Sequence, residues 1–160
     1  MAILLTGGAG YIGSHTRSEL QRQGYDVVVF DNLQYGHRQA VRDCPLLVGD
    51  LLHPEEINAV FDEHDIAGVI HFAAYVSVGE SMQNPTKYFR NNVQGTVNLA
   101  TAMLDHGVQN IVFSSTCAVY GQPQSVPVTE AESKKPESAY GASKLMAEQV
   151  LEWFGTTRGL

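Results

Sequence analysis

The 160-residue sequence has no long uninterrupted run of apolar residues, and this absence predicts that no segment spans a membrane. Clusters of lysine and arginine are also missing, and 17 acidic residues outnumber 10 basic ones, giving a formal net charge of −7. This acidic balance weighs against nucleic acid as a partner. Internal repeats and low-complexity tracts are absent as well. The length and apolar content that remain predict one globular domain over residues 1–160.

Cysteine is scarce, and histidine is scattered. Cys44 and Cys117 lie far apart and follow no spacing typical of a metal site or a redox motif. We therefore expect no metal centre and two reduced thiols, which favours a cytoplasmic location. His71, at the end of a predicted strand, is the one histidine near the expected cleft, and we interpret it as structural.

Apolar segments of strand and helix type alternate along the chain. This alternation predicts an α/β fold with a doubly wound parallel sheet, Rossmann-like, in strand order 3-2-1-4-5. A proline-containing segment, 122–138, is expected to lack regular structure and to flank a substrate entrance. The expected strands are 2–6, 26–30, 46–48, 68–72 and 110–115, and the expected helices are 12–23, 54–64, 85–106 and 139–154.

Three glycines lie between the first strand and the first helix. Gly7, Gly10 and Gly13 form a G-x-x-G-x-x-G motif, not the more common G-x-G-x-x-G. A strand–turn–helix context lets the backbone approach a pyrophosphate, and the helix start offers free N–H groups. A tight turn with close helix packing is the plainer interpretation. The context favours dinucleotide binding, with Tyr11 and Ile12 at the helix start.

An acidic residue follows the second strand. Asp31 lies 18 residues after Gly13, where a carboxylate can accept both ribose hydroxyls of an adenosine. The same carboxylate would repel a 2′-phosphate, which favours NAD over NADP, although Arg38 would complicate this if its loop folds back. The alternative is an aspartate that caps a turn.

Other candidate cofactor contacts follow the later strands, because doubly wound sheets bind ligands at the carboxyl ends of their strands. Asp50 is placed to receive the adenine amino group. Ala73 and Ala74 would let a cofactor lie close to the backbone, although core packing explains small residues equally well. The segments concerned are Gly49-Asp50-Leu51, His71-Phe72-Ala73-Ala74 and Ser114-Ser115-Thr116.

A tyrosine and a lysine are spaced by four residues in the last predicted helix. A helix turns every ~3.6 residues, so Tyr140 and Lys144 project from one face. An ammonium group near a phenol favours the phenolate, the form that acts as a base. An isolated Y-x-x-x-K match is usually a surface pair. Here it follows the fifth strand and Thr116, which brings phenol, ammonium and hydroxyl groups to one cleft.

Together these motifs resemble the extended short-chain dehydrogenase/reductases, and among them most closely the UDP-glucose 4-epimerases. The resemblance extends from residue 1 to about residue 154. The glycine and Y-x-x-x-K motifs specify only the superfamily, whereas residues 71–81 with 140–146 are typical of nucleotide-sugar enzymes. The matching segments are Thr6 to Thr16, Val29 to Leu33, His71 to Ala74, Val78 to Ser81, Asn91 to Val93, Phe113 to Thr116, Val119 to Gly121 and Tyr140 to Met146.

The resemblance implies a reaction and a set of roles. Tyr140 would take the proton of the sugar 4-hydroxyl while hydride passes to tightly held NAD, and the 4-keto sugar would turn before the hydride returns to its other face. Thr116 would hydrogen-bond the reacting hydroxyl, and Lys144 would bind the ribose. The family also implies a homodimer through helices 85–106 and 139–154. The cofactor positions implied are Gly7, Gly10, Tyr11, Ile12, Gly13, Asp31, Asn32, Asp50, Leu51, Phe72, Ala73, Ala74, Asn91, Ser114 and Lys144.

The sequence departs from this family in length. Members continue into a sixth strand and a smaller domain that holds the UDP-sugar, so we expect residues 1–160 to form an NAD-binding domain without that substrate domain. The strand at 110–115 is then an apolar edge prone to pairing with another chain. Little epimerisation is expected from the 160 residues alone.

Alternative functions remain at this point. A 4,6-dehydratase carries an Asp-Glu pair after the Ser/Thr, and Cys117-Ala118 stand there instead. Related decarboxylases and 4-reductases are not separated from an epimerase by these residues. A non-catalytic NAD-binding module is the alternative from another class.

Overall fold

Five parallel strands form one sheet in the order β3-β2-β1-β4-β5, which confirms the predicted fold class and strand order. The computed structural model describes residues 1–160. The strands are β1 (Ala2–Thr6), β2 (Val27–Asp31), β3 (Leu46–Val48), β4 (Ile66–His71) and β5 (Ile111–Phe113).

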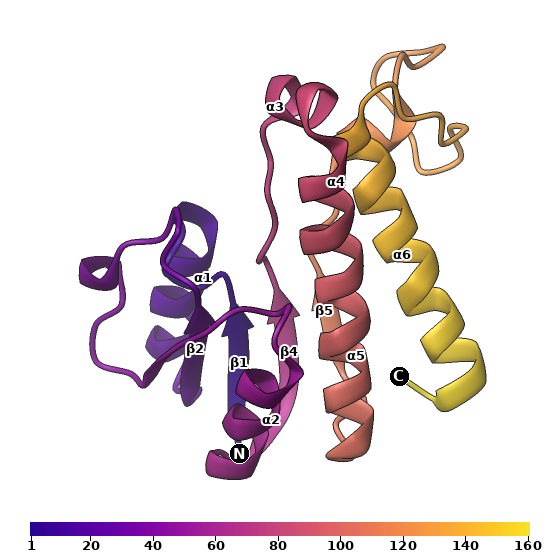
Figure 1. Cartoon of the computed structure of the whole chain (residues 1–160). Coiled ribbons are helices and arrows are strands. Elements are labelled where there is room, and N and C mark those ends of the chain that lie inside the picture. Colours follow the sequence, from indigo (N-terminus) through magenta and orange to yellow (C-terminus); the bar gives the residue numbers. More distant parts are fainter.

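The strand register aligns the carboxyl ends of the central strands. Thr6 at the end of β1 pairs with Phe30 and with His71, and His71 in turn pairs with Phe113. In Figure 1 β1 and β4 point upward, toward the side of the molecule on which α3 lies and α6 begins. The segments that follow the strands are therefore gathered at one edge.

The longer helices lie where the periodicity predicts them. In Figure 1 α6 runs alongside α5 beyond the β5 edge. Proline opens α2 and α4, where its missing N–H costs nothing. The helices are α1 (Tyr11–Arg22), α2 (Pro54–Glu63), α3 (Val78–Gln83), α4 (Pro85–Tyr88), α5 (Gly95–Asp105) and α6 (Ala139–Arg158), with the 3₁₀ turns η1 (Arg38–Ala40) and η3 (Cys117–Tyr120) and the π-helical η2 (Phe89–Gln94).

Two helical predictions need correction. The single helix expected over 85–106 is interrupted by the π-helical η2 between α4 and α5, where backbone hydrogen bonds join residues five positions apart and not four. Helix α3 was not expected; its N-cap is Ser77, whose hydroxyl accepts a hydrogen bond from the Glu80 N–H.

Helix α6 is longer than the expected 139–154. Thr156 and Thr157 still lie within α6, and their hydroxyls donate to the carbonyls of Glu152 and Trp153 one turn back. The helix ends at Gly159, whose φ of 80° is left-handed. Among the strands, β2 and β4 differ from the prediction by one or two residues, and β5 is shorter because only Ile111–Phe113 pair with β4.

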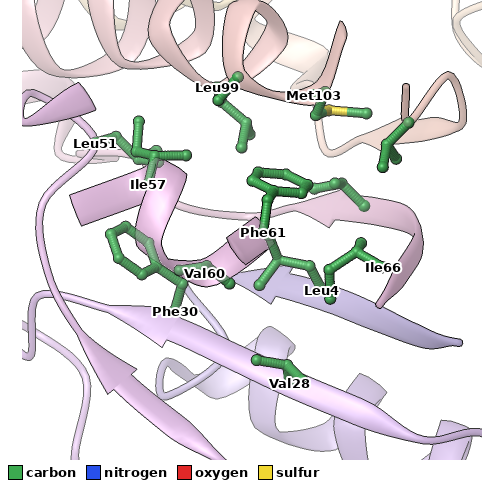
Figure 2. Packing of buried hydrophobic residues seen from close by; sticks show 13 residues of the cluster. Leu4, Val28, Phe30, Leu51, Ile57, Val60, Phe61, Ile66, Leu99 and Met103 are labelled. Carbon is green, nitrogen blue, oxygen red and sulfur yellow. The ribbon is translucent and has the colours of Figure 1, made fainter. Parts of the chain in front are cut away.

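The hydrophobic core fills one face of the sheet, under α2 and α5. Leu4 and Phe30 point from the sheet toward Ile57 and Phe61 of α2 and Leu99 of α5 (Figure 2). The other face carries a smaller cluster, in which Leu5, Val27 and Val29 are fully buried. This asymmetry leaves the second face of β4 and β5 thinly covered.

The β5 edge of the sheet is open, as expected. Val112 is 62% exposed. A hollow of about 520 Å³ beside it is lined by residues of β1, β4 and β5 and by Leu160. The segment 122–138 contains neither helix nor strand, as predicted. Every helix is too short or too polar to cross a lipid bilayer.

Candidate cofactor and catalytic site

The glycine turn lets β1, α1 and the segment after β4 pack at backbone distance. Gly7 has a φ of 71°, and a Cβ there would lie 2.6 Å from the Ala73 backbone nitrogen. A Cβ at Gly13 would lie 2.4 Å from the carbonyl oxygen of Gly7. Close internal packing therefore requires two of the three glycines. Gly10 is less confined, with 3.3 Å to the same oxygen, and it faces the pocket.

The start of α1 offers backbone donors beside this turn. Gly10 is the N-cap, and no side chain caps the helix. The first-turn amides of Tyr11 and Ile12 accordingly have no helical acceptor, and both side chains are largely exposed. A helix start with free amides and a favourable dipole suits an anion such as a pyrophosphate.

A pocket lies at the carboxyl edge of the sheet next to this turn. It gathers most of the residues predicted to hold a dinucleotide, from the ends of β1, β2, β3 and β4. Tyr11 lines a neighbouring pocket with Gly10 and Tyr35, whereas Ile12, Gly13, Ser114 and Lys144 line neither. The lining residues are Gly7, Gly10, Phe30, Asp31, Asn32, Tyr35, Gly36, Gly49, Asp50, Leu51, Phe72, Ala73, Ala74, Tyr75 and Asn91.

Asp31 and Asp50 are the acidic residues of this pocket. The Asp31 carboxylate accepts hydrogen bonds from the N–H groups of Ala9 (3.0 Å) and Leu33 (2.8 Å), one on each oxygen. Asp31 therefore caps its own turn, as the alternative interpretation of this residue proposed. Each carboxylate oxygen can still accept a second hydrogen bond. Asp50 accepts from the Asn32 side chain (3.0 Å) and from the Leu52 N–H (2.9 Å).

A contact across the pocket was not predicted from the sequence. The hydroxyl of Tyr75, after β4, donates to the side-chain oxygen of Gln34, after β2. The rings of Tyr35 and Tyr75 meet edge to face with centroids 5.7 Å apart, and Lys87 Nζ lies 4.3 Å from the Tyr75 ring. Burial raises the pKa of Tyr75. An aromatic residue at position 35 was the one feature of the sequence that could have indicated this contact. Its partner, Tyr75, is distant in sequence.

The tyrosine and lysine of the Y-x-x-x-K motif lie on the first turns of α6. Ser138 caps this helix by accepting from the Gly141 N–H. Lys144 is 3% exposed, and its Nζ lies 4.1 Å from the centre of the Phe113 ring. Burial lowers the pKa of Lys144 to about 8, an effect that Glu148 opposes. Lys144 is thus a buried amine at the end of β5.

Thr116 is brought close to this helix by tight packing. A Cβ at Gly141 would lie 2.6 Å from the Ala118 carbonyl oxygen, so the start of α6 rests directly on η3. The Thr116 hydroxyl accepts from the Ala118 N–H at 3.2 Å, and no hydrogen bond joins it to Tyr140. The structure therefore places Thr116, Tyr140 and Lys144 on packed elements at one edge, without direct bonds among them. The Ser114 N–H bonds to the His71 carbonyl at that edge.

His71 is fully buried and structural, as interpreted from the sequence. Its ring nitrogens contact the hydroxyls of Thr6 (2.6 Å) and Thr96 (3.1 Å). Burial, assisted by the nearby charge of Lys144, lowers the pKa of His71 to about 3. Cys44 and Cys117 are both free thiols, and no three His, Cys, Asp or Glu side chains converge as a metal site would require.

Comparison with known proteins agrees with this geometry. A family profile described as the NAD dependent epimerase/dehydratase family matches residues 3–160. The UDP-glucose 4-epimerase of Halalkalibacterium halodurans is 48% identical over the whole chain, which spans 48% of that relative. The chain thus spans about half the length of the curated relatives it matches.

Solved structures give the same result. The Brucella ovis UDP-glucose 4-epimerase in complex with NAD superposes with a TM-score of 0.97 at 45% identity, covering 99% of this chain and 49% of that one. The Thermotoga maritima UDP-glucose 4-epimerase with UDP-glucose gives a TM-score of 0.95 at 36% identity, covering 100% and 53%. The chain therefore belongs to the NAD-dependent epimerase/dehydratase family.

Proposed function

We propose that this chain forms the NAD-binding and catalytic part of a UDP-glucose 4-epimerase. The observation that carries the proposal is the meeting of two features at one sheet edge. The pocket gathers most of the residues predicted to bind a dinucleotide, from the ends of four strands, and the buried amine of Lys144 lies at the end of the fifth strand. Relatives that match the whole chain are epimerases by name, and solved relatives carry NAD or UDP-glucose.

The residues present fit NAD. The free amides at Tyr11 and Ile12 suit a pyrophosphate, and the unoccupied lone pairs of the Asp31 carboxylate suit ribose hydroxyls. A carboxylate at that place disfavours a 2′-phosphate, which supports NAD over NADP. NAD, when bound, supplies a hydride acceptor that can return the hydride. The remaining contacts are proposed for Gly7, Gly10, Gly13, Asn32, Asp50, Leu51, Phe72, Ala73, Ala74, Asn91, Ser114 and Lys144.

The catalytic roles fall to three residues on packed elements. Tyr140 takes the proton of the sugar 4-hydroxyl, and Lys144 supplies the positive charge that favours the phenolate. Thr116 donates to the reacting oxygen. Its hydroxyl already accepts from the Ala118 N–H, so its own proton is free for a substrate oxygen. Because Thr116 is held by a backbone bond, its orientation is set before substrate arrives.

A non-catalytic NAD-binding module is the second candidate. It is favoured by the absence of a hydrogen bond between Thr116 and Tyr140, whose hydroxyl groups would have to act together on one substrate oxygen. Under this alternative the dinucleotide pocket functions and the tyrosine does not act as a base.

Two measurements on the 160-residue protein test the proposal. The protein is first incubated with NAD, freed of excess nucleotide and denatured, and the released NAD is quantified. We expect about one NAD per chain; none would refute the dinucleotide site. The protein is then given UDP-galactose for hours, and UDP-glucose is measured by chromatography. A slow yield that Tyr140→Phe abolishes supports the epimerase, whereas NAD binding with a yield unchanged by Tyr140→Phe supports the module.

We also propose a homodimer through the helices over 85–106 (α4, η2 and α5) and 139–154 (in α6), and a cytoplasmic location. Both free cysteines agree with a reducing compartment. Exposed Met146 and Trp153 lie with Val93, Val97 and Val150 along a groove between the two helices. Contiguous apolar side chains of this kind mark interaction surfaces.

A further inference from the structure

A series of buried hydrogen bonds, joined through the backbone and side chain of Asn92, crosses the molecule from the glycine turn to the proposed catalytic helix α6. It starts at Thr6, whose hydroxyl contacts His71 Nδ1 at 2.6 Å, and continues from His71 Nε2 to the Thr96 hydroxyl at 3.1 Å. Thr96 donates to the Asn92 carbonyl oxygen at 2.7 Å. All four side chains are at most 2% exposed.

The remaining hydrogen bonds of this series lead to the backbone carbonyl of Tyr140. Asn92 Nδ2 donates to the Ser143 hydroxyl at 3.0 Å, and Ser143 donates to the carbonyl oxygen of Tyr140 at 2.7 Å. Ser143 is completely buried. These hydrogen bonds thus join β1, β4, η2, α5 and α6 through side chains that are buried from water.

Every hydrogen bond in this series is donated in the same direction, from Thr6 toward α6. Thr96 uses its only proton on the Asn92 carbonyl, so its oxygen must accept from His71, which requires a proton on Nε2. His71 Nδ1 is then the acceptor for the Thr6 hydroxyl. The orientation of the Asn92 amide is settled by the Tyr75 backbone, which donates to its oxygen and accepts from its nitrogen.

These hydrogen bonds reach three of the segments proposed to hold the cofactor or the reacting groups: the glycine turn, the segment after β4 and the start of α6. Thr6 immediately precedes Gly7. The two bonds between Asn92 and Tyr75 hold the segment that follows Ala73 and Ala74. Asn91 also donates to the Asn92 oxygen at 2.9 Å. Each segment would sit differently if a link were lost, because hydrogen bonds in a dry interior leave few alternative partners.

We infer that His71, as its Nε2–H tautomer, and Thr96 are positioning residues that set the catalytic helix α6 relative to the glycine turn. The inference rests on the proposed function for its consequence in NAD binding, and on the hydrogen-bond geometry alone for the tautomer. Neither residue touches the pocket, so each acts only through Thr6, Asn92 and Ser143. The low pKa of His71 agrees with a neutral ring; Lys144 of α6 is the one charged group that affects it.

Nitrogen NMR of the wild-type protein tests the tautomer directly. Protein labelled with ¹⁵N at histidine is expected to show His71 with a protonated Nε2 and an unprotonated Nδ1, unchanged between pH 5 and 8. A protonated Nδ1, or a titration within that range, would overturn the inference. This result depends neither on NAD binding nor on the folding of any variant.

Variants at Thr96 test the coupling. Thr96→Val keeps the volume and loses the hydroxyl, and Thr96→Ser keeps the hydroxyl. Thr101→Val is the matched control. The Thr101 hydroxyl also donates to a carbonyl one turn back in α5, but Thr101 is exposed and takes no part in the buried series of hydrogen bonds. We expect Thr96→Val to weaken NAD binding about fivefold or more, comparable to one buried hydrogen bond, and Thr96→Ser to stay within about twofold.

The amide resonances of Gly7 and Gly141 provide a readout at both ends of the chain. Thr96→Val should shift both, while Thr96→Ser and Thr101→Val should leave both near their wild-type positions. If Thr96→Val changes the melting temperature alone, with both amides and NAD affinity as in Thr96→Ser, Thr96 is only structural and the inference fails. Absence of NAD binding in the wild type would instead refute the proposed function, and the tautomer and amide measurements would still decide the inference.

Discussion

The Nζ atom of Lys144 lies 4.1 Å from the centre of the Phe113 ring, so the Lys144 amine of α6 contacts the last residue of β5. Burial lowers the pKa of Lys144 from 10.5 to about 8. Between these pH values the folded protein binds fewer protons at this site than the unfolded chain. The site therefore makes the free energy of unfolding rise with pH from about 8 to 10.5, and below about pH 8 it is a constant penalty.

Replacing Lys144 with methionine is expected to stabilise the protein while it impairs the site. The variant loses the cost of a buried charge and keeps the side-chain volume. We expect the free energy of unfolding at pH 7 to increase by roughly 1–3 kcal/mol, after allowing for the lost contact with Phe113. Urea denaturation at pH 7 and pH 9 measures this, and the gain should shrink at pH 9. A Lys144→Met variant less stable than wild type at pH 7 would contradict the conclusion that burial of the Lys144 charge destabilises the protein at that pH.

NAD affinity is expected to decline as the pH rises through the pKa of Lys144. Under the proposed function, the protonated Lys144 amine would attract the dinucleotide and donate hydrogen bonds to it, and the neutral amine would do so less. Between pH 7 and pH 9 we expect the dissociation constant to increase by up to about tenfold. Titration of the purified protein with NAD at several pH values measures it. Lys144→Met is the control and should bind weakly at every pH; a parallel decline in that variant would assign the effect to another group.

Gly13→Ala is expected to disrupt the turn beneath the pocket. The added Cβ would lie 2.4 Å from the Gly7 carbonyl oxygen, and backbone atoms cannot yield as a flexible side chain does. We expect a loss of about 2 kcal/mol or more in the free energy of unfolding, together with loss of NAD binding. Gly79→Ala is the control, because nothing lies within 4 Å of that Cβ inside α3, and alanine there should stabilise by about 0.5–1 kcal/mol.

The parts of this fold that the sequence predicts are those set by neighbours along the chain. Gly7, Gly10 and Gly13 are close in sequence to the strand and helix they join, and the strand–helix alternation leaves few topologies. The contact between Gln34 and Tyr75 joins residues 41 positions apart, and no local pattern encodes it. The π-helical turns of η2 escaped prediction for a related reason, since Asn92 is held there by bonds to Tyr75 and Ser143 in two other segments.

Tyr75→Phe is expected to accelerate the exchange of NAD. The variant removes the hydroxyl that bonds Gln34 across the pocket, and it keeps the ring that contacts Lys87 and Tyr35. Both association and dissociation should become faster, by about threefold or more, because one hydrogen bond no longer joins the loops. Stopped-flow fluorescence measures the rates. Gln34→Ala should reproduce the effect; unchanged rates in both variants would show that the contact does not restrict entry.

Trp153→Glu is expected to convert the proposed dimer to a monomer. Trp153 is 67% exposed and lies beside Met146 in the groove between α5 and α6, so a charge there would be buried without a partner on association. Val112→Lys offers the comparison at the β5 edge, where lysine opposes pairing between strands. Sedimentation velocity at several protein concentrations measures both. A dimer lost with Val112→Lys and kept with Trp153→Glu would assign the association to the open sheet edge, because pairing through β5 uses its free backbone groups and does not use the groove that Trp153 lines.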